Sequence, residues 1–151
     1  MPCPELFFDS SALFSGVISA SGASRALLLL GEAGQVSITL SEQVVTETER
    51  AVARKLPRAL ADFRETIRAT GMCIVRDPSP SEIEAYVDII AHPADVPIVV
   101  AAVQVETDYL VTLNRRHFID DPAVAERSEL RIGTPGDALA WVRRYLMEAE
   151  V

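Results

Sequence analysis

Residues with oxygen-bearing side chains stand where several predicted strands and helices begin or end. Asp9 directly follows the first apolar run, Asn114 follows another, and Asp95 precedes a long apolar segment. The helix predicted after the second strand carries Glu47 and Glu49 at opposite edges of its apolar stripe, and periodicity does not choose between them. In open parallel α/β sheets, ligands bind outside the carboxyl ends of the strands. We therefore interpret these positions as candidate catalytic residues that converge on one sheet edge.

The chemistry of such a cluster follows from its charge. Neighbouring carboxylates repel each other, and each raises the pKa of the next unless a cation neutralises them. Oxygen ligands of this kind suit Mg²⁺ or Mn²⁺, which bind hard oxygens and keep several waters. The natural reaction at such a site is metal-assisted attack of water on a phosphodiester.

Each candidate also has a purely structural interpretation. Asp9 stands before two serines, and Asp95 stands two residues before Pro97, so both positions are typical of helix N-caps. A glutamate on an amphipathic helix is ordinarily solvated, and an asparagine after a strand is ordinarily a turn residue. The capping role and the site role are compatible for Asp9, because both place its carboxylate at the strand tip.

Basic residues flank the candidate acids. Arg50 and Arg54 lie on the same side of the predicted helix as Glu47, and Arg115 and Arg116 follow the fourth predicted strand. A basic ridge beside a metal site would bind an RNA backbone while the metal acts on one phosphate. The alternative is ordinary surface charge with a helical pair between Glu47 and Arg50.

The elements that must position these residues alternate between strand and helix. Strands are predicted at 6–8, 36–40, 72–75, 109–113 and 130–132, and helices at about 25–32, 41–56, 58–70, 81–90, 96–107 and from 135 onward. A helical stretch after the first strand is expected to break near Gly16 and again at 19–22. This alternation predicts an α/β fold with three α/β/α layers around a central, mainly parallel sheet.

Composition sets further bounds. The 151 residues suit a single domain over 1–151, and a hydrophobic fraction of 49% with only 6% aromatics favours α/β packing. The net charge of -8 argues against broad non-specific nucleic-acid binding, which needs a basic footprint. Cys3 and Cys73 fit no metal or disulfide pattern, which suits a reducing cytoplasm. We expect no signal peptide, because no basic residue precedes Arg25, and no membrane span.

The segments FFDSSALFSG, SEQVVTETER, HPADVPIVVAAV, DYLVTLNRRHF and RIGTPGDAL, in this order and spacing, carry a resemblance that covers almost the whole chain. The chain resembles PIN domains, the nuclease fold of many prokaryotic toxin–antitoxin toxins. The resemblance implies a PIN-like fold and a Mg²⁺- or Mn²⁺-dependent endoribonuclease that is the toxin of such a pair. It also implies RNA as substrate, with an antitoxin protein and a second copy of the chain as partners.

The resemblance also assigns roles to particular residues. It makes Asp9, Glu47 and Asp95 the acids that hold the metal, and so selects Glu47 over Glu49. Family members commonly carry an acid where this chain has Asn114. The asparagine can offer a carbonyl oxygen but brings no charge, which weakens a two-metal site more than a one-metal site.

Two rival functions follow from the same residues. A PIN-like chain with weak or no catalysis would be an RNA- or protein-binding module, with its acidic edge occupied by a partner's basic side chain; Asn114 and the acidic net charge motivate this reading. Phosphatase chemistry on Asp9 is a third class, although the second acid that it usually needs two residues later is missing. We interpret His92 and His117 as surface or loop residues, because a metal-bound water needs no further base.

Overall fold

The computed structural model describes residues 3–149. The strands are β1 (Glu5–Phe8), β2 (Ser37–Ser41), β3 (Cys73–Val75), β4 (Tyr109–Val111) and β5 (Ile132–Gly133). The α-helices are α1 (Ser10–Ile18), α2 (Ala23–Glu32), α3 (Glu42–Lys55), α4 (Leu60–Thr70), α5 (Pro80–Ala85), α6 (Val96–Gln104), α7 (Arg115–Phe118), α8 (Ala123–Ser128) and α9 (Pro135–Ala149). Two short 3₁₀ helices are η1 (Pro57–Ala59) and η2 (Pro93–Asp95).

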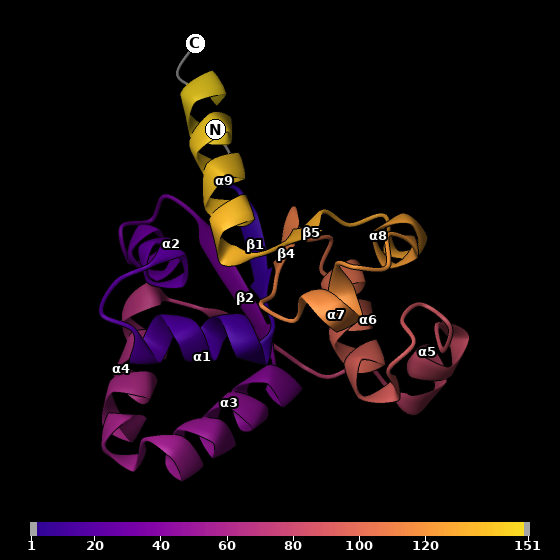
Figure 1. The fold of residues 1–151 in the computed structure, drawn as a ribbon, viewed down its shortest axis with the longest axis horizontal. Helices are drawn as coiled ribbons and strands as arrows, with labels where there is room; N and C mark the ends of the chain where they lie inside the picture. The colour runs from indigo at the N-terminus through magenta and orange to yellow at the C-terminus, as the bar shows by residue number, and fades with distance from the viewer. Residues whose placement is uncertain (1–2, 150–151) are drawn as a thin grey trace.

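The strands form one parallel sheet in the order β3-β2-β1-β4-β5. Apart from the exposed Glu5, the central strands β1 and β4 are apolar and almost fully buried, as expected for a parallel sheet covered on both faces. Figure 1 shows α1 to α4 on one side of the strands and α5 to α8 on the other. The predicted three-layer α/β/α fold with a parallel central sheet is therefore confirmed.

The strand order reverses between β1 and β4, and this reversal positions the candidate site. The chain runs outward from β1 to β3 and then returns to place β4 on the other side of β1. Phe8 pairs with Val111, and the N–H of Asp9 continues this pairing with a hydrogen bond of 3.1 Å to the carbonyl oxygen of Val111. The residues that follow β1 and β4 therefore lie side by side at the point where ligands bind in open α/β sheets.

Two helices present their first turns to the same edge. Ser41 caps α3, because its hydroxyl oxygen accepts a hydrogen bond from the N–H of Val44. Helix α6 is apolar around most of its circumference and buries Val99 and Val100 completely. The first turn of α3 contacts the segment just before α6, because Nε2 of Gln43 donates a hydrogen bond of 2.9 Å to the carbonyl oxygen of Ala94.

Several predicted elements have different limits in the structure. Helix α1 continues through Gly16 and ends at Ile18, because Gly16 serves close packing: a Cβ there would lie 2.6 Å from Cδ1 of Leu28 in α2. Helix α5 ends at Ala85 instead of residue 90, and α7 and α8 were not predicted. Within residues 3–149, no single helix is long and apolar enough to cross a bilayer, and the joined length of α1 and α2 is bent by 86°.

We expect Gly133→Ala to destabilise the fold. A Cβ on Gly133 would lie 2.3 Å from the hydroxyl oxygen of Tyr109 and 3.0 Å from Cβ of Asp137, so β5 or α9 would have to move. Overpacking of this kind costs about 1–3 kcal/mol of unfolding free energy, measurable by urea denaturation. Gly136→Ala is the matched control, because a Cβ there meets only the Thr134 hydroxyl at 3.8 Å. Equal stability of the two variants would contradict this prediction.

Candidate active site

Asp9 stands at the tip of β1 and caps α1. Its Oδ1 accepts hydrogen bonds from the N–H of Ala12 at 2.9 Å and from the Ser11 hydroxyl at 2.7 Å. Its Oδ2 accepts from the hydroxyl of Thr112 at 2.5 Å. Asp9 is only 3% exposed. The structural role considered for Asp9 is therefore real, and it leaves the carboxylate fixed at the strand tip.

Thr112 links the tips of the two central strands. It is fully buried directly after β4, and its hydroxyl oxygen also accepts a hydrogen bond of 2.9 Å from the N–H of Asn114. The loop after β4 is tied to α1 as well, since the N–H of Leu113 donates to the Ser11 hydroxyl at 3.0 Å. These bonds fix the carboxylate of Asp9 from two elements that are far apart in sequence.

Burial raises the pKa of Asp9 above the usual aspartate range, because the carboxylate loses its hydration. The hydrogen bonds from Thr112, Ala12 and Ser11 oppose that shift, and the negative charge of Asp95 adds to it. Asp95 makes the smallest of these contributions to the pKa of Asp9. A buried acid next to another acid is typical of functional sites.

Asp95 ends η2 directly before α6, but its side chain does not cap that helix. Its Oδ2 lies 2.9 Å from Nδ1 of His117, and both side chains are mostly buried. A hydrogen bond from Nδ1 to an ionised Asp95 needs the proton on Nδ1, whereas a hydrogen bond from Nδ2 of Asn114 to the same nitrogen needs Nδ1 unprotonated, so Nδ1 bonds to one of these two side chains at a time. Asp95 therefore occupies the N-cap position considered for it, but its carboxylate makes no capping hydrogen bond and instead contacts His117 of α7.

Asn114 occupies the N-cap of α7. Its Oδ1 accepts a hydrogen bond of 3.1 Å from the N–H of His117, and its Nδ2 lies 3.0 Å from the ring Nδ1 of the same residue. The carbonyl oxygen that we expected to face a metal is thus engaged by the backbone. Asn114 touches the acids through His117.

His117 is part of the site, contrary to our interpretation of it as a surface or loop residue. Its ring contacts Asp95 and Asn114, and it stacks on the exposed ring of His92 with centroids 3.4 Å apart. The sequence offered no signal for this arrangement, because α7 has a single turn and η2 lies far from it in the chain.

Glu47 and Glu49 face different neighbours. Glu47 is half-buried on α3, and Gln43 Nε2 lies 3.4 Å from its Oε2 and 2.9 Å from the carbonyl oxygen of Ala94. Gln43 therefore joins Glu47 to the segment that carries Asp95. Glu49 instead pairs with Arg64 of α4 at 3.3 Å.

Within the described residues, the candidate acids do not all come together at one point. Asp9 and Asp95 share the edge, and Glu47 borders it. Within residues 3–149, no three His, Cys, Asp or Glu side chains come close enough to hold one ion. The chemical type of the donors fits Mg²⁺ or Mn²⁺, since carboxylate oxygens are their preferred protein ligands. The fit is one of donor chemistry, and the negative charge of Asp95 contributes to raising the pKa of Asp9.

The predicted RNA-binding arginines lie at the surface around this edge. Arg50 and Arg54 are exposed on α3, one and two turns beyond Glu47, and Arg115 and Arg116 are exposed on α7. Among the described residues, none of the four forms an ion pair within 4.0 Å. Their charges therefore remain available to a phosphate backbone.

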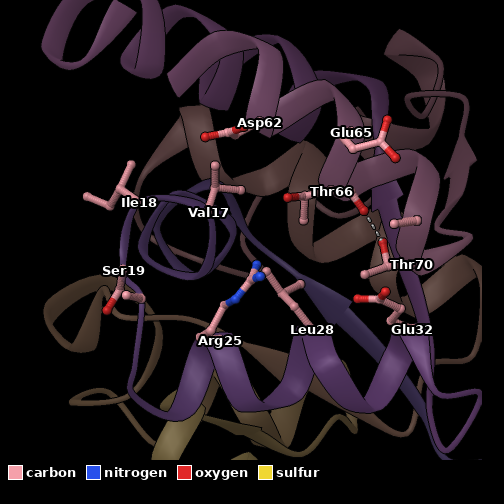
Figure 2. Close-up of a pocket in the computed structure, with 12 residues that line it drawn as sticks. Val17, Ile18, Ser19, Arg25, Leu28, Glu32, Asp62, Glu65, Thr66 and Thr70 are labelled. Carbon is pink, nitrogen blue, oxygen red and sulfur yellow. Dashed lines mark hydrogen bonds between the residues drawn. The ribbon is translucent and has the colours of Figure 1, made fainter. Parts of the chain in front are cut away.

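One cavity is lined by none of the candidate acids Asp9, Glu47 and Asp95. It has a volume of about 640 Å³ between α1, α2 and α4. Figure 2 shows Arg25 at its floor, with Glu32, Asp62 and Glu65 around it. A second cavity of about 430 Å³ lies between α1 and α3 and includes Glu47 in its wall. The second cavity is the one that adjoins the candidate site.

Fold and site together define a three-layer α/β protein with carboxylates at the switch point of a parallel sheet. The model of the PIN domain family matches residues 5–116, and the chain belongs to this family. The predicted family is therefore confirmed. No curated protein sequence matches the chain.

Solved structures share the fold at low sequence identity. PAE2754 from Pyrobaculum aerophilum is 13% identical with a TM-score of 0.64, over 93% of this chain and 96% of that one. VapBC2 from Rickettsia felis, solved with a DNA fragment from its promoter, is 16% identical with a TM-score of 0.62, over 86% and 98%. VapC20 from Mycobacterium tuberculosis, a toxin that cleaves the sarcin–ricin loop, is 13% identical with a TM-score of 0.53, over 70% and 86%.

Proposed function

We propose that this PIN domain is a Mg²⁺- or Mn²⁺-dependent endoribonuclease and the toxin of a toxin–antitoxin pair. The observation that carries the proposal is the pair of carboxylates at the switch point. Asp9 is buried, its pKa is raised by desolvation, and the charge of Asp95 raises it further. Such a pair opposes folding unless a cation relieves it, so its presence supports a site that binds a divalent metal.

The side chains divide the work of such a site. Asp9 and Asp95 would hold the metal, with Glu47 on the α3 side. A bound ion would supply a water of lowered pKa and neutralise charge on the reacting phosphate. The Thr112 hydroxyl fixes the orientation of Asp9, and His117 fixes that of Asp95. Residues that hydrogen-bond to metal ligands commonly orient those ligands in this way.

In this proposal Asn114 does not contact the metal and acts through His117. By capping α7 it holds the backbone of His117, and so it positions the ring that contacts Asp95. The role is indirect, in contrast to the direct or water-mediated metal contact that we expected from the sequence. One uncharged amide in place of an acid leaves less charge at the edge, which favours one metal over two.

Substrate and partner follow from the surroundings of the site. Arg50, Arg54, Arg115 and Arg116 would bind RNA phosphates on either side of the acids. The likeness to VapC20, a toxin that cleaves the sarcin–ricin loop, supports RNA as the substrate. We propose an antitoxin protein and a second copy of the chain as partners. Cys3 and Cys73 are free and exposed, which supports a reducing compartment such as the cytoplasm.

The proposal is tested by metal-dependent cleavage of labelled RNA. We expect cleavage with Mn²⁺, none with a chelator, and recovery when Mn²⁺ is restored. Glu47→Gln should lower the rate roughly 10- to 100-fold, because the third carboxylate is lost from the edge. Glu49→Gln is the matched control on the same helix, since it removes only an exposed ion pair with Arg64. Cleavage that survives the chelator, or equal losses in both variants, would contradict the proposal.

A binding module without catalysis is the second candidate. Two observations favour it: no three acids gather around one ion within residues 3–149, and Asp95 is already engaged by His117. A basic side chain of a partner could then take the place of the metal. Calorimetric titration with Mn²⁺ separates the two functions, because the module predicts no binding below millimolar concentrations and the nuclease predicts binding that Asp9→Asn removes.

A further inference from the structure

The cavity between α1 and α3 is built into the edge of the candidate site. Helices α1 and α3 pack against each other, and Figure 1 shows them side by side below the sheet. Ser11, Glu47 and Leu113 form the end of the cavity nearest the acids. Ser11 donates to Asp9 and accepts from the N–H of Leu113, so this wall shares hydrogen bonds with the candidate site.

The lining combines apolar faces with hydroxyl groups. Phe14 is half-buried, and Leu113 and Ile18 remain 47% and 41% exposed although both are large and apolar. Ser10 and Ser15 add hydroxyls that can donate or accept. A flat ring with apolar neighbours and a few polar groups is the chemistry that holds an unstacked nucleobase.

The charge of the lining changes along α3. Glu47 stands at the end near the acids, and Lys55 stands two turns further along the helix. The ammonium group of Lys55 lies 5.2 Å from the centroid of the Phe14 ring. A cation over a partly exposed ring is held more weakly than a base stacked on one, so a nucleotide can displace Lys55 towards its own phosphate.

We propose that this cavity, which we call the α1–α3 groove, binds one unstacked nucleotide of single-stranded RNA next to the phosphate that is cleaved. The base stacks on Phe14, its edge meets the serine hydroxyls of α1, and Lys55 pairs with the next phosphate along the strand. A volume of about 430 Å³ is within the range of small-molecule sites and accommodates a single nucleotide. The inference rests on the proposed function, because it takes RNA as the substrate.

The test measures RNA binding apart from cleavage. Fluorescence anisotropy of a short labelled single-stranded RNA is recorded in the presence of a chelator. We expect Phe14→Leu, which keeps the apolar volume and removes the ring, to weaken binding roughly 5- to 100-fold. Phe14→Tyr keeps the ring and should bind within about twofold of the wild type. Melting temperatures of both variants establish that the fold is intact.

The proposed contact of Lys55 with a phosphate is tested by the salt dependence of RNA binding. Lys55→Met should weaken binding and reduce the slope of log affinity against log salt by about 0.7, the value for one phosphate contact on a single strand. Arg143→Gln is the matched control, because this exposed cation lies on α9, away from the α1–α3 groove. An equal loss of slope in both variants would overturn the proposed phosphate contact.

The outcomes separate the α1–α3 groove from the proposed nuclease. Unchanged RNA binding in Phe14→Leu overturns the groove proposal, even where Mn²⁺-dependent cleavage is present. Weakened binding in Phe14→Leu and Lys55→Met supports the groove proposal, even where no cleavage is found and the nuclease proposal fails. Where cleavage is present, Phe14→Leu should raise KM with little change in kcat, as expected when an interaction shared by ground and transition states is lost.

Discussion

Asp9→Asn is expected to abolish RNA cleavage and, at the same time, to make the protein more stable at neutral pH. Cleavage should fall by roughly 100- to 1,000-fold, because the variant loses the buried carboxylate that would hold the metal. The asparagine keeps an oxygen for the N–H of Ala12 and the Ser11 hydroxyl. Its amide nitrogen then donates to Thr112, so the loop after β4 stays attached to α1.

The gain in stability follows from proton linkage. The folded-state pKa of Asp9 lies above the ordinary value of 3.8, so the folded state holds the proton more tightly than the unfolded state. Over the interval between those two pKa values the unfolded chain binds fewer protons, and the free energy of unfolding falls as pH rises. The full penalty applies above the folded-state pKa. Asp9→Asn removes this penalty and should gain about 0.5–2 kcal/mol, as active-site neutralisations commonly do.

Urea denaturation at several pH values measures this effect. The difference between Asp9→Asn and the wild type should be largest near neutral pH and shrink towards acid pH. Mn²⁺ should raise the melting temperature of the wild type but not of the variant, because only a bound ion shifts the equilibrium. Asp62→Asn, an exposed acid on α4, is the control and should change neither readout. A variant less stable than the wild type at neutral pH would show that the Asp9 charge supports the fold.

The sequence was sufficient for the fold because the strands are short, apolar and separated by strong helix signals. The runs before Asp9 and Asn114 are buried strands, and their neighbouring positions follow from the strand order. Gly16 was misleading: glycine was interpreted as a helix break, whereas its missing side chain allows α2 to approach α1. Helix propensity gives no information about such a contact between helices, since close approach depends on tertiary packing.

The site was predictable only as far as single strand tips and helix ends. Asp9 and Asp95 were candidates because each borders a predicted element. The contact of Asp95 with His117 depends on how η2 meets α7, and no local pattern encodes that meeting. The N-cap role of Asn114 belongs to a helix of one turn, too short to produce a periodic signal. Sequence therefore indicated where the acids are, and the structure was needed to identify what orients them.

Asp95→Asn should abolish cleavage as fully as Asp9→Asn. It should also lower the pKa of Asp9, which remains in this variant. Removing the charge of Asp95 removes one of the causes that raise the pKa of Asp9, so the pKa of Asp9 should fall. Carboxyl-carbon NMR titration of Asp9 in both proteins measures this change directly. Asp88→Asn, an exposed acid between α5 and η2, is the control and should leave the Asp9 titration unchanged.

The same variant tests how the two acids depend on each other. With Asp95 neutral, His117 loses its carboxylate partner, and only the contacts with Asn114 and His92 remain to hold the ring. Without the Asp95 charge, the edge should bind Mn²⁺ at least roughly tenfold more weakly, because the ion loses one of the carboxylates that would neutralise it and keeps Asp9 with Glu47 at the border. Cleavage and Mn²⁺ affinity equal to those of the wild type would show that Asp95 takes no part in metal binding. Its role would then be to hold His117 of α7 in place.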